Sequence, residues 1–338
     1  MKDELIAVAK ALVVPGKGIL AADESTDSIK KRFDKIGVES TPENHRIYRQ
    51  LLFETPGIEE FISGVIMFDE TLRQKSSDGI FFPELLRKEG IIPGIKVDRG
   101  AKDLANFPGE KITEGLDGLR ERLAEYKNLG AKFTKWRVVI TIGDGIPTQT
   151  CINSNAESLA RFAALSQEAG LVPIVEPEVL MDGNHSIERS AEVTTATLQS
   201  VFTRLNEHKI QFSGMLLKPN FVHPGLENQR KIEGKIIARS TLDTLRKVVP
   251  SEVPGLVFLS GGDTPGESTV HLDAMNEIGG VPWQLSFSFG RALQQPVLEI
   301  WRGKPENKQE AQKVFYNRAK LNSLARYGKY SKEMEENI

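Results

Sequence analysis

The chain has 338 residues, 39% hydrophobic and 27% charged, which is typical of a soluble globular protein with room for one large barrel or two ordinary domains. Its formal net charge is only −2, so we expect it to bind neither nucleic acid nor an anionic membrane surface. The single cysteine, Cys151, excludes an internal disulfide and favours a reducing compartment, which predicts a cytoplasmic protein.

The start of the chain has the pattern of an amphipathic helix. Residues 1–14 mix the charged Lys2, Asp3, Glu4 and Lys10 with apolar residues at helical spacing. A secretory signal peptide would need an uncharged apolar run and a small-residue cleavage site, and this segment has neither. We therefore predict a helix here rather than a targeting signal.

A regular alternation of strand-like and helix-like segments fills most of the remaining chain. Short apolar runs rich in β-branched residues predict eight strands, at residues 18–23, 61–69, 91–98, 133–140, 171–178, 212–219, 255–262 and 283–289. Apolar residues at helical spacing predict helices between them, at residues 43–53, 84–88, 115–128, 157–168, 186–207, 231–248 and 268–278. No linker divides the series, so we predict a single domain over residues 1–338.

Eight strand–helix units predict an α/β fold, a (β/α)8 TIM barrel with N-terminal and C-terminal helical additions, the second at residues 306–326. A doubly wound open sheet is the alternative, but eight strands are more than its common form uses. The polar residues 327–338 are predicted to form a mobile C-terminal tail.

The predicted strands end in polar residues, and in a barrel these ends meet at one mouth, where the active sites of this fold lie. Several of these residues are spaced by two, so both members of a pair should point to the same side of the strand. This concentration predicts a functional site rather than a set of solvated strand ends. The residues are Asp23, Asp69, Lys96, Asp98, Lys135, Arg137, Glu176, Glu178, Lys218, Ser260 and Ser288.

Lys218 follows a short apolar run and precedes Pro219. A lysine buried at such a position is costly as an ammonium, and its neutral amine is the form that attacks a carbonyl to give a Schiff base. Lys135 and Arg137 would favour that neutral form, because a nearby like charge disfavours protonation. We predict Lys218 as the nucleophile; the alternative is a strand-end lysine that reaches solvent.

Three carboxylates are predicted to assist Lys218. Glu176 lies between Lys135 and Lys218 in barrel order, where it would relay protons during Schiff-base formation or pair with Lys135, or do both. Asp23 should stay ionised beside lysines and act as a base toward a substrate hydroxyl, with a helix N-cap as its alternative role. Glu178 follows Glu176 by two residues and is predicted to join the catalytic group.

Two groups of residues predict anion-binding sites on opposite sides of the mouth. Glycines let backbone N–H groups approach an anion, and arginine adds a charge-assisted hydrogen bond. The first group is Ser260, Gly261, Ser288, Gly290 and Arg291, and the second is Ser25, Ser28, Lys96 and Arg137. Two phosphate sites around a lysine nucleophile predict a bisphosphorylated sugar as the substrate.

The sequence gives no sign of a metal or cofactor in the mechanism. Its five histidines, His45, His185, His208, His223 and His271, lack any ligand spacing such as His-x-x-His. It also lacks the G-x-G-x-x-G and Walker A patterns of dinucleotide and nucleotide sites. We therefore predict no cofactor and no catalytic metal.

These segments resemble class I fructose-bisphosphate aldolases, the metal-independent Schiff-base family. The resemblance runs in order from about residue 5 to about residue 330. It is carried by residues 16–25 (GKGILAADES), 94–98 (GIKVD), 135–137 (KWR), 174–178 (IVEPE), 216–220 (LLKPN), 258–262 (FLSGG) and 287–293 (FSFGRAL).

The resemblance implies cleavage of fructose 1,6-bisphosphate to dihydroxyacetone phosphate and glyceraldehyde 3-phosphate, in glycolysis or gluconeogenesis. It implies Lys218 as the Schiff-base lysine, Glu176 as its proton-transfer partner, Lys135 as an assisting lysine and Asp23 near the cleaved bond. The first anion group matches the site of the C1 phosphate and the second the positions near the C6 phosphate. A homotetramer is also implied.

The chain departs from the family at its C-terminus, at Phe289, where many relatives carry tyrosine, and at Asp27, where many carry glycine, and two rival functions remain. Animal members end in a tyrosine that helps to protonate the enamine, whereas the last tyrosine here is Tyr330, so the resemblance implies a different or slower step. A transaldolase-like enzyme with a singly phosphorylated substrate is disfavoured by the second anion group. A scaffold protein without turnover is disfavoured because Lys218, Glu176, Asp23 and Lys135 are all present. Fructose 1-phosphate and sedoheptulose bisphosphate stay open as substrates.

Overall fold

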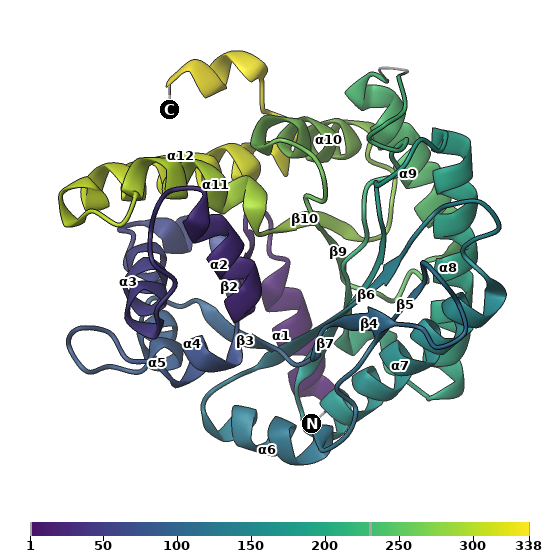
Figure 1. The fold of residues 1–338 in the computed structure, drawn as a ribbon, viewed down its shortest axis with the longest axis horizontal. Helices are drawn as coiled ribbons and strands as arrows, with labels where there is room; N and C mark the ends of the chain where they lie inside the picture. The colour runs from purple at the N-terminus through teal and green to yellow at the C-terminus, as the bar shows by residue number, and fades with distance from the viewer. Residues whose placement is uncertain (1, 230–231, 338) are drawn as a thin grey trace.

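The computed structural model describes residues 2–229 and 232–337. Within these residues, eight parallel strands close into a barrel that helices surround (Figure 1), which confirms the predicted (β/α)8 fold and excludes the open sheet. In order around the barrel the strands are β1 (Gly18–Ala22), β10 (Gln284–Phe289), β9 (Gly255–Phe258), β8 (Leu216–Leu217), β7 (Val172–Val179), β6 (Phe133–Ile140), β3 (Ile92–Lys96) and β2 (Ile62–Met67).

Strand β8 is much shorter than the predicted segment at residues 212–219. A 3₁₀ turn, η2 (Phe212–Gly214), occupies its beginning. Pro219 follows Lys218 and has no N–H to donate to a neighbouring strand, so the ladder ends early. The short strand nevertheless places Lys218 at the barrel mouth, because Lys218 N still donates to the carbonyl of Val175 at 2.8 Å.

The predicted helices form the outer layer of the barrel, with bounds that differ by a few residues. They are α3 (Pro42–Phe53), α5 (Phe82–Lys88), α6 (Leu119–Asn128), α7 (Gln149–Glu168), α8 (Ile187–Glu207), α9 (Gly234–Val248) and α10 (Pro265–Ile278). The predicted start of α9, residue 231, lies outside the described residues. Helix α7 begins earlier than predicted because the Thr148 hydroxyl accepts from Cys151 N as an N-cap. Among the residues that the structure describes, no helix combines the length and apolarity needed to span a bilayer.

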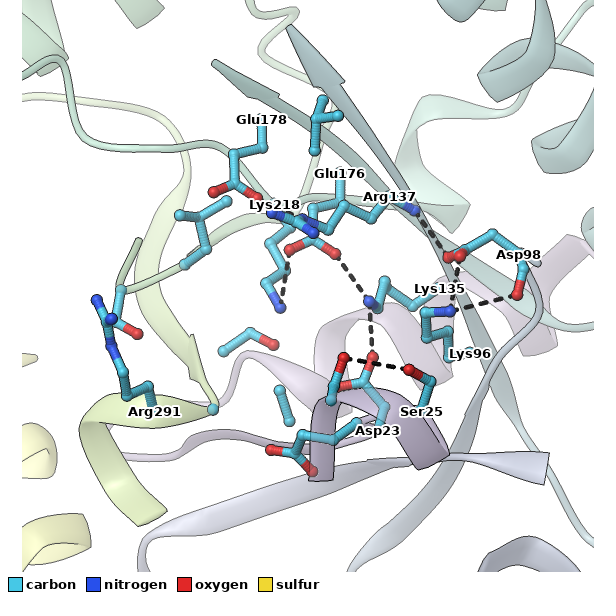
Figure 2. Close-up of a pocket in the computed structure, with 18 of the residues that line it drawn as sticks. Asp23, Ser25, Lys96, Asp98, Lys135, Arg137, Glu176, Glu178, Lys218 and Arg291 are labelled. Atoms are coloured by element: carbon cyan, nitrogen blue, oxygen red, sulfur yellow. Dashed lines mark hydrogen bonds and ion pairs between the residues drawn. The ribbon is translucent and has the colours of Figure 1, made fainter. Parts of the chain in front are cut away.

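Several short elements lie outside the predicted pattern. They are the helices α2 (Thr26–Asp34), α4 (Asp69–Arg73) and α11 (Arg291–Trp301), an antiparallel pair β4 (Ala101–Asp103) and β5 (Lys111–Thr113), and the 3₁₀ turns η1 (Ile58–Glu60) and η3 (Pro305–Asn307). Of these, α2 and α11 matter most for function, because each begins beside the barrel mouth (Figure 2).

The N-terminal helix α1 (Lys2–Leu12) closes the amino end of the barrel. Its apolar face, Leu5, Ala9 and Leu12, is buried in one cluster with inward-facing strand residues such as Ile19 and Ile174. This packing explains the amphipathic pattern of the segment, since its charged residues remain outside the barrel. Substrate access is therefore left to the opposite, carboxyl end.

Inward-facing residues change from apolar to charged along the barrel strands. On β7, Val172 and Ile174 belong to the apolar cluster inside the barrel, and Glu176 comes next on the same face. On β6, Phe133 fills the same layer and Lys135 follows it two residues later. The period of two thus builds an apolar floor with a charged layer above it.

The C-terminal helix α12 (Lys308–Ala325) is the helix predicted at residues 306–326, and it packs against α10 and α11. Beyond it, the described part of the predicted tail forms a 3₁₀ turn, η4 (Lys332–Asn337). Glu335 in this turn pairs with Arg318 at 2.5 Å and accepts from the Tyr330 hydroxyl at 2.8 Å. The tail's mobility stays a prediction, and residue 338 lies outside the described residues.

Candidate active site

A cavity of about 430 Å³ opens at the carboxyl ends of the barrel strands (Figure 2). Every residue predicted for catalysis or substrate binding lines it, namely Asp23, Ser25, Ser28, Lys96, Lys135, Arg137, Glu176, Glu178, Lys218, Ser260, Gly261, Ser288, Gly290 and Arg291. Asp69 does not line this cavity: it begins α4, pairs with Arg73 at 3.0 Å, and lines an adjoining cavity that shares Ser25, Ser28 and Lys96 with this one.

A chain of ion pairs crosses the centre of the cavity (Figure 2). Lys218 Nζ lies 3.2 Å from Glu176 Oε1, and the other oxygen of Glu176 lies 3.1 Å from Lys135 Nζ. Lys135 Nζ lies 2.6 Å from Asp23 Oδ2. Two cations and two anions therefore alternate in a buried row, so their charges compensate one another away from water.

Strand order explains this alternation. Glu176 projects from β7, between Lys135 on β6 and Lys218 beyond β8. Lys135 occupies the same inward face as Arg137, and both line the cavity, as the spacing of two predicts. The strands that carry Lys135, Glu176 and Lys218 are direct neighbours, so the barrel itself sets the distances between these three side chains. Asp23 follows β1 and reaches Lys135 from another part of the barrel mouth.

Lys135 and its two carboxylates hold one another in their charged forms. Burial alone would raise the pKa values of Asp23 and Glu176, but the positive charges of Lys135 and Lys218 outweigh it and hold both below their ordinary values. Burial would lower the pKa of Lys135, yet Asp23 and Glu176 raise it above its ordinary value. Both carboxylates are thus held in the ionised form, and Lys135 remains an ammonium.

Lys218 is the lysine of the row with fewer carboxylate partners. Among the described residues it has one carboxylate within ion-pair distance, whereas Lys135 has two. Its side chain is buried, with 4% exposed. Glu176, at 3.2 Å, is the group placed to exchange a proton with Lys218, which lines the cavity.

On one side of Lys218, the loop after β9 meets the start of α11. Gly261 has a positive φ of 50°, which turns the loop sharply after Ser260. Arg291, in the first turn of α11, donates to the carbonyls of Gly261 and Asp263. The Ser288 hydroxyl is buried and has no hydrogen-bond partner among the described residues. A free hydroxyl, a helix N-terminus and a guanidinium suit an anion here.

On the other side, Ser25 caps α2 without using its side chain for the cap. Its hydroxyl instead donates to the Ser28 hydroxyl at 3.1 Å, beside the start of the helix. Lys96 pairs with Asp98 at 2.7 Å, and Arg137 pairs with Glu178. A bound anion would compete with these carboxylates for the two cations. In this second site, the anion would therefore replace Asp98 and Glu178 as the partner of Lys96 and Arg137.

Two further charged residues, Glu24 and Arg32, also line the cavity and were not predicted as site residues. Arg32 Nη1 lies 2.5 Å from Glu24 Oε1, and Glu24 also pairs with the buried Arg49 at 2.6 Å. Arg32 lies on α2, which was not predicted. The signal that could have revealed it is the spacing of Ile29 and Phe33, the two buried residues of this short, charged helix.

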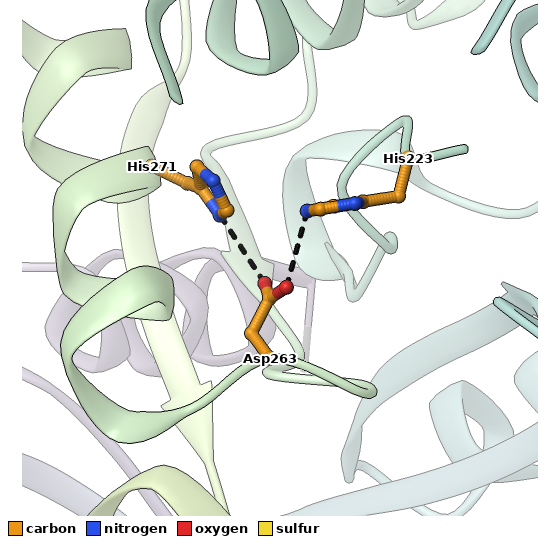
Figure 3. Close-up of side chains that lie close together, drawn as sticks. All are labelled: His223, Asp263 and His271. Carbon is orange, nitrogen blue, oxygen red and sulfur yellow. Dashed lines mark hydrogen bonds and ion pairs between the residues drawn. The ribbon is translucent and has the colours of Figure 1, made fainter. Parts of the chain in front are cut away.

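A group of residues that the histidine spacing did not reveal lies nearby. His223 follows β8, Asp263 follows β9 and His271 lies on α10, and the structure brings the three together (Figure 3). Their ligand atoms lie within 4.8 Å of one another. None of the three lines the large cavity, so this group is separate from the row of lysines and carboxylates.

Comparison with known proteins gives a consistent result. Residues 4–338 match the family model described as fructose-bisphosphate aldolase class-I. The chain is 53% identical over 329 residues to a probable fructose-bisphosphate aldolase class 1 of Xanthomonas campestris, covering 97% of this chain and 98% of the relative. It is 51% identical over 329 residues to a cytoplasmic isozyme of fructose-bisphosphate aldolase from Spinacia oleracea, covering 97% and 92%.

A solved structure is similar to this chain in both fold and sequence. The fold matches fructose-bisphosphate aldolase from Plasmodium falciparum, determined in complex with TRAP and a small-molecule inhibitor, with a TM-score of 0.96. The two chains share 51% sequence identity, and the match covers 97% of this chain and 95% of that one.

Proposed function

Because this chain belongs to the class-I fructose-bisphosphate aldolase family of carbon–carbon lyases, we propose that it cleaves fructose 1,6-bisphosphate to dihydroxyacetone phosphate and glyceraldehyde 3-phosphate, and catalyses the reverse condensation. The observation that carries the proposal is Lys218, buried 3.2 Å from Glu176 in a cavity with an anion-binding group on each side. Lys218 would act through a Schiff base.

In the proposed first half-reaction, Glu176 takes a proton from the Lys218 ammonium, and the free amine attacks C2 of the sugar. Glu176 then returns a proton to the carbinolamine hydroxyl, which leaves as water and gives the protonated imine. The 3.2 Å separation of the two side chains suits these transfers.

The protonated imine draws electrons from the C3–C4 bond. Asp23, ionised and within 2.6 Å of Lys135, takes the proton of the C4 hydroxyl as that bond breaks, so that the aldehyde leaves and an enamine remains on Lys218. The enamine takes up a proton at C3, and water hydrolyses the resulting imine to dihydroxyacetone phosphate. Lys135 stays charged and keeps both carboxylates in place.

The phosphates would hold the sugar across the cavity. We assign the C1 phosphate to the group of Ser260, Gly261, Ser288, Gly290 and Arg291, and the C6 phosphate to the group of Ser25, Ser28, Lys96 and Arg137. Glu178 was predicted as a catalytic residue. Since it pairs with Arg137, we propose that it positions this arginine until the C6 phosphate replaces it.

The proposal extends to the setting of the enzyme. The matching family is a glycolytic one, which supports a role in glycolysis or gluconeogenesis. The spinach relative is a cytoplasmic isozyme, which supports a cytoplasmic location. The resemblance to the family also implies a homotetramer. Light scattering during gel filtration would then give a mass four times that of the 37.5-kDa chain, and a monomer would contradict the tetramer.

The activity is tested by coupling triose phosphate formation to NADH oxidation, with fructose 1,6-bisphosphate, fructose 1-phosphate and sedoheptulose bisphosphate as substrates. We expect the bisphosphates to be cleaved fastest, and Lys218→Met to lower kcat by at least about 10⁴-fold. Lys308→Met, at an exposed pair with Glu54, is the control and should keep full activity. Undiminished turnover by Lys218→Met would refute the proposal.

A further inference from the structure

We propose that His223, Asp263 and His271 form a binding site for a divalent transition-metal ion such as Zn²⁺, which fastens the loop after β9 that carries Ser260 and Gly261 to the body of the barrel. The site is separate from the reacting centre, and the inference does not depend on the proposed reaction. Two imidazoles and one carboxylate are a ligand set that Zn²⁺ and its neighbours in the series accept.

The distances within the group fit a small metal ion. His223 Nε2 lies 3.1 Å from Asp263 Oδ1, and His271 Nδ1 lies 3.2 Å from Asp263 Oδ2 (Figure 3). In a tetrahedral zinc site with bonds of about 2.0–2.1 Å, neighbouring ligand atoms are about 3.3 Å apart. The two nitrogen–oxygen separations already have this size, although they run to different oxygens of Asp263, and the three ligand atoms lie within 4.8 Å of one another. Rotation of the side chains would bring them to three corners and leave the fourth to water.

His223 supplies a second, independent indication. Its Nε2 is buried and makes no hydrogen bond of proper geometry among the described residues, even though the carboxylate of Asp263 is only 3.1 Å away. A buried nitrogen that faces a carboxylate without hydrogen bonding to it is costly unless a further partner exists. A cation between the two atoms would satisfy both at once.

The three side chains are also held in place before any ion binds. The exposed fraction of the side chain is 15% for His223, 5% for His271 and 3% for Asp263. The His271 ring packs edge-on against Phe221 at 5.3 Å and lies 5.0 Å from the His223 ring, measured between centroids. Such packing restricts rotation of the rings, so ordering the ligands would cost little entropy on binding.

The position of these three residues in the fold indicates a structural role for the ion. Asp263 directly precedes the N-cap of α10, Thr264, and its carbonyl accepts a hydrogen bond from Arg291 of the proposed C1-phosphate site. His271 is on α10 itself, and His223 belongs to the segment after β8 that also contains Lys218. An ion would therefore tie the loop with Ser260 and Gly261 to its own helix α10 and to the neighbouring barrel unit of β8.

The test uses the full-length protein without a histidine tag, stripped of metal by a chelator and then dialysed. Titration with Co²⁺ should produce the visible absorption of tetrahedral cobalt and saturate at one ion per chain, and Zn²⁺ should displace the cobalt and raise the melting temperature. If the unmodified protein binds neither ion, the inference is overturned without recourse to any variant.

Matched variants locate the ion. His223→Gln and His271→Asn keep a polar group near the position of the ligand nitrogen, and each should weaken Co²⁺ binding by about tenfold or more and abolish the thermal shift with Zn²⁺. His208→Gln is the control, because His208 pairs with Glu157 elsewhere and should bind the ion as the unmodified protein does. Binding that persists unchanged in both ligand variants would overturn the inference.

Discussion

Replacing Lys135 with methionine would remove the cation that two buried carboxylates share. Methionine is unbranched and of similar length, so the change tests charge more than packing. In the variant, Glu176 would keep Lys218 at 3.2 Å, whereas Asp23 would lose the ammonium that now lies 2.6 Å away. After the substitution, Asp23 is therefore a buried carboxylate that has lost its nearest compensating cation.

The expected loss in the free energy of unfolding follows from the distance between the two charges. Two unit charges 2.6 Å apart attract each other by about 6 kcal/mol at an effective dielectric constant of about 20. Part of this attraction only offsets desolvation, and breaking a buried pair costs about 3–5 kcal/mol of stability. We expect Lys135→Met to lower the free energy of unfolding by that amount at neutral pH. Lys308→Met, in an exposed pair at 3.3 Å from Glu54, should cost less than about 1 kcal/mol.

The loss should depend on pH with a definite sign. In the unmodified protein, burial raises the pKa of Asp23, but Lys135, together with Lys218 and Lys96, outweighs it, so the pKa lies below the ordinary 3.8. This pair thus contributes stability that is present above about pH 4 and lost as the pH falls through the native pKa. In the variant, only Lys218 and Lys96 remain to oppose burial, so the pKa of Asp23 is higher than in the unmodified protein and less stability is lost as the pH falls. The two proteins should therefore become closer in stability as the pH falls.

Urea unfolding followed by tryptophan fluorescence measures the effect, in a cycle that adds Asp23→Asn and the double variant. Removing the stranded carboxylate should restore part of the loss, so the double variant should be more stable than the sum of the single losses predicts, by at least about 1 kcal/mol. Additive losses would refute the reasoning. So would a Lys135→Met variant as stable as Lys308→Met.

Three further predictions concern single residues. Glu176→Gln should lower kcat by about 10²–10⁴-fold with little change in KM, because the amide cannot relay protons; steady-state kinetics on fructose 1,6-bisphosphate would show this, and an unchanged kcat would exclude the relay. Arg291→Met should lower kcat/KM by about 10–100-fold through loss of a charge-assisted bond to phosphate, and should weaken competitive inhibition by inorganic phosphate in parallel; inhibition as strong as before would place the anion elsewhere. Cys151 is buried, and burial followed by the charge of Glu110 raises its pKa to about 11, so Ellman's reagent should modify it only after unfolding in guanidinium; rapid modification of the native protein would contradict this burial.

The barrel and the charged layer at its mouth were predictable because they follow from two simple periods. Alternating strand and helix patterns specify the topology, and the spacing of two places Lys135 with Arg137 and Glu176 with Glu178 on the inward face. Strand order then puts Glu176 between Lys135 and Lys218 without any knowledge of the loops.

The exact partners could not be predicted, because they depend on side-chain reach and loop path. Lys96 pairs with Asp98 and Arg137 pairs with Glu178. From the sequence alone, each of these cations could equally pair with other carboxylates at the barrel mouth. Asp69 shows the same dependence, since the acidic residue after β2 begins α4 and lines the adjoining cavity instead of the one that contains Lys218.

The histidine group shows the limit of spacing rules. His223 and His271 come from segments that follow two different strands, and only the folded loops bring them to Asp263. Rules based on ligands close together in sequence miss such a site, because its spacing reflects the length of an intervening barrel unit.

The central claim, that Lys218 forms the Schiff base, is tested most directly by borohydride trapping. The protein is incubated with dihydroxyacetone phosphate, reduced, digested and analysed by mass spectrometry. We predict a single reduced adduct on Lys218, formed also by Lys308→Met and absent from Lys218→Met. An adduct on Lys135 or another lysine, or no adduct in a protein that still cleaves the sugar, would contradict the claim.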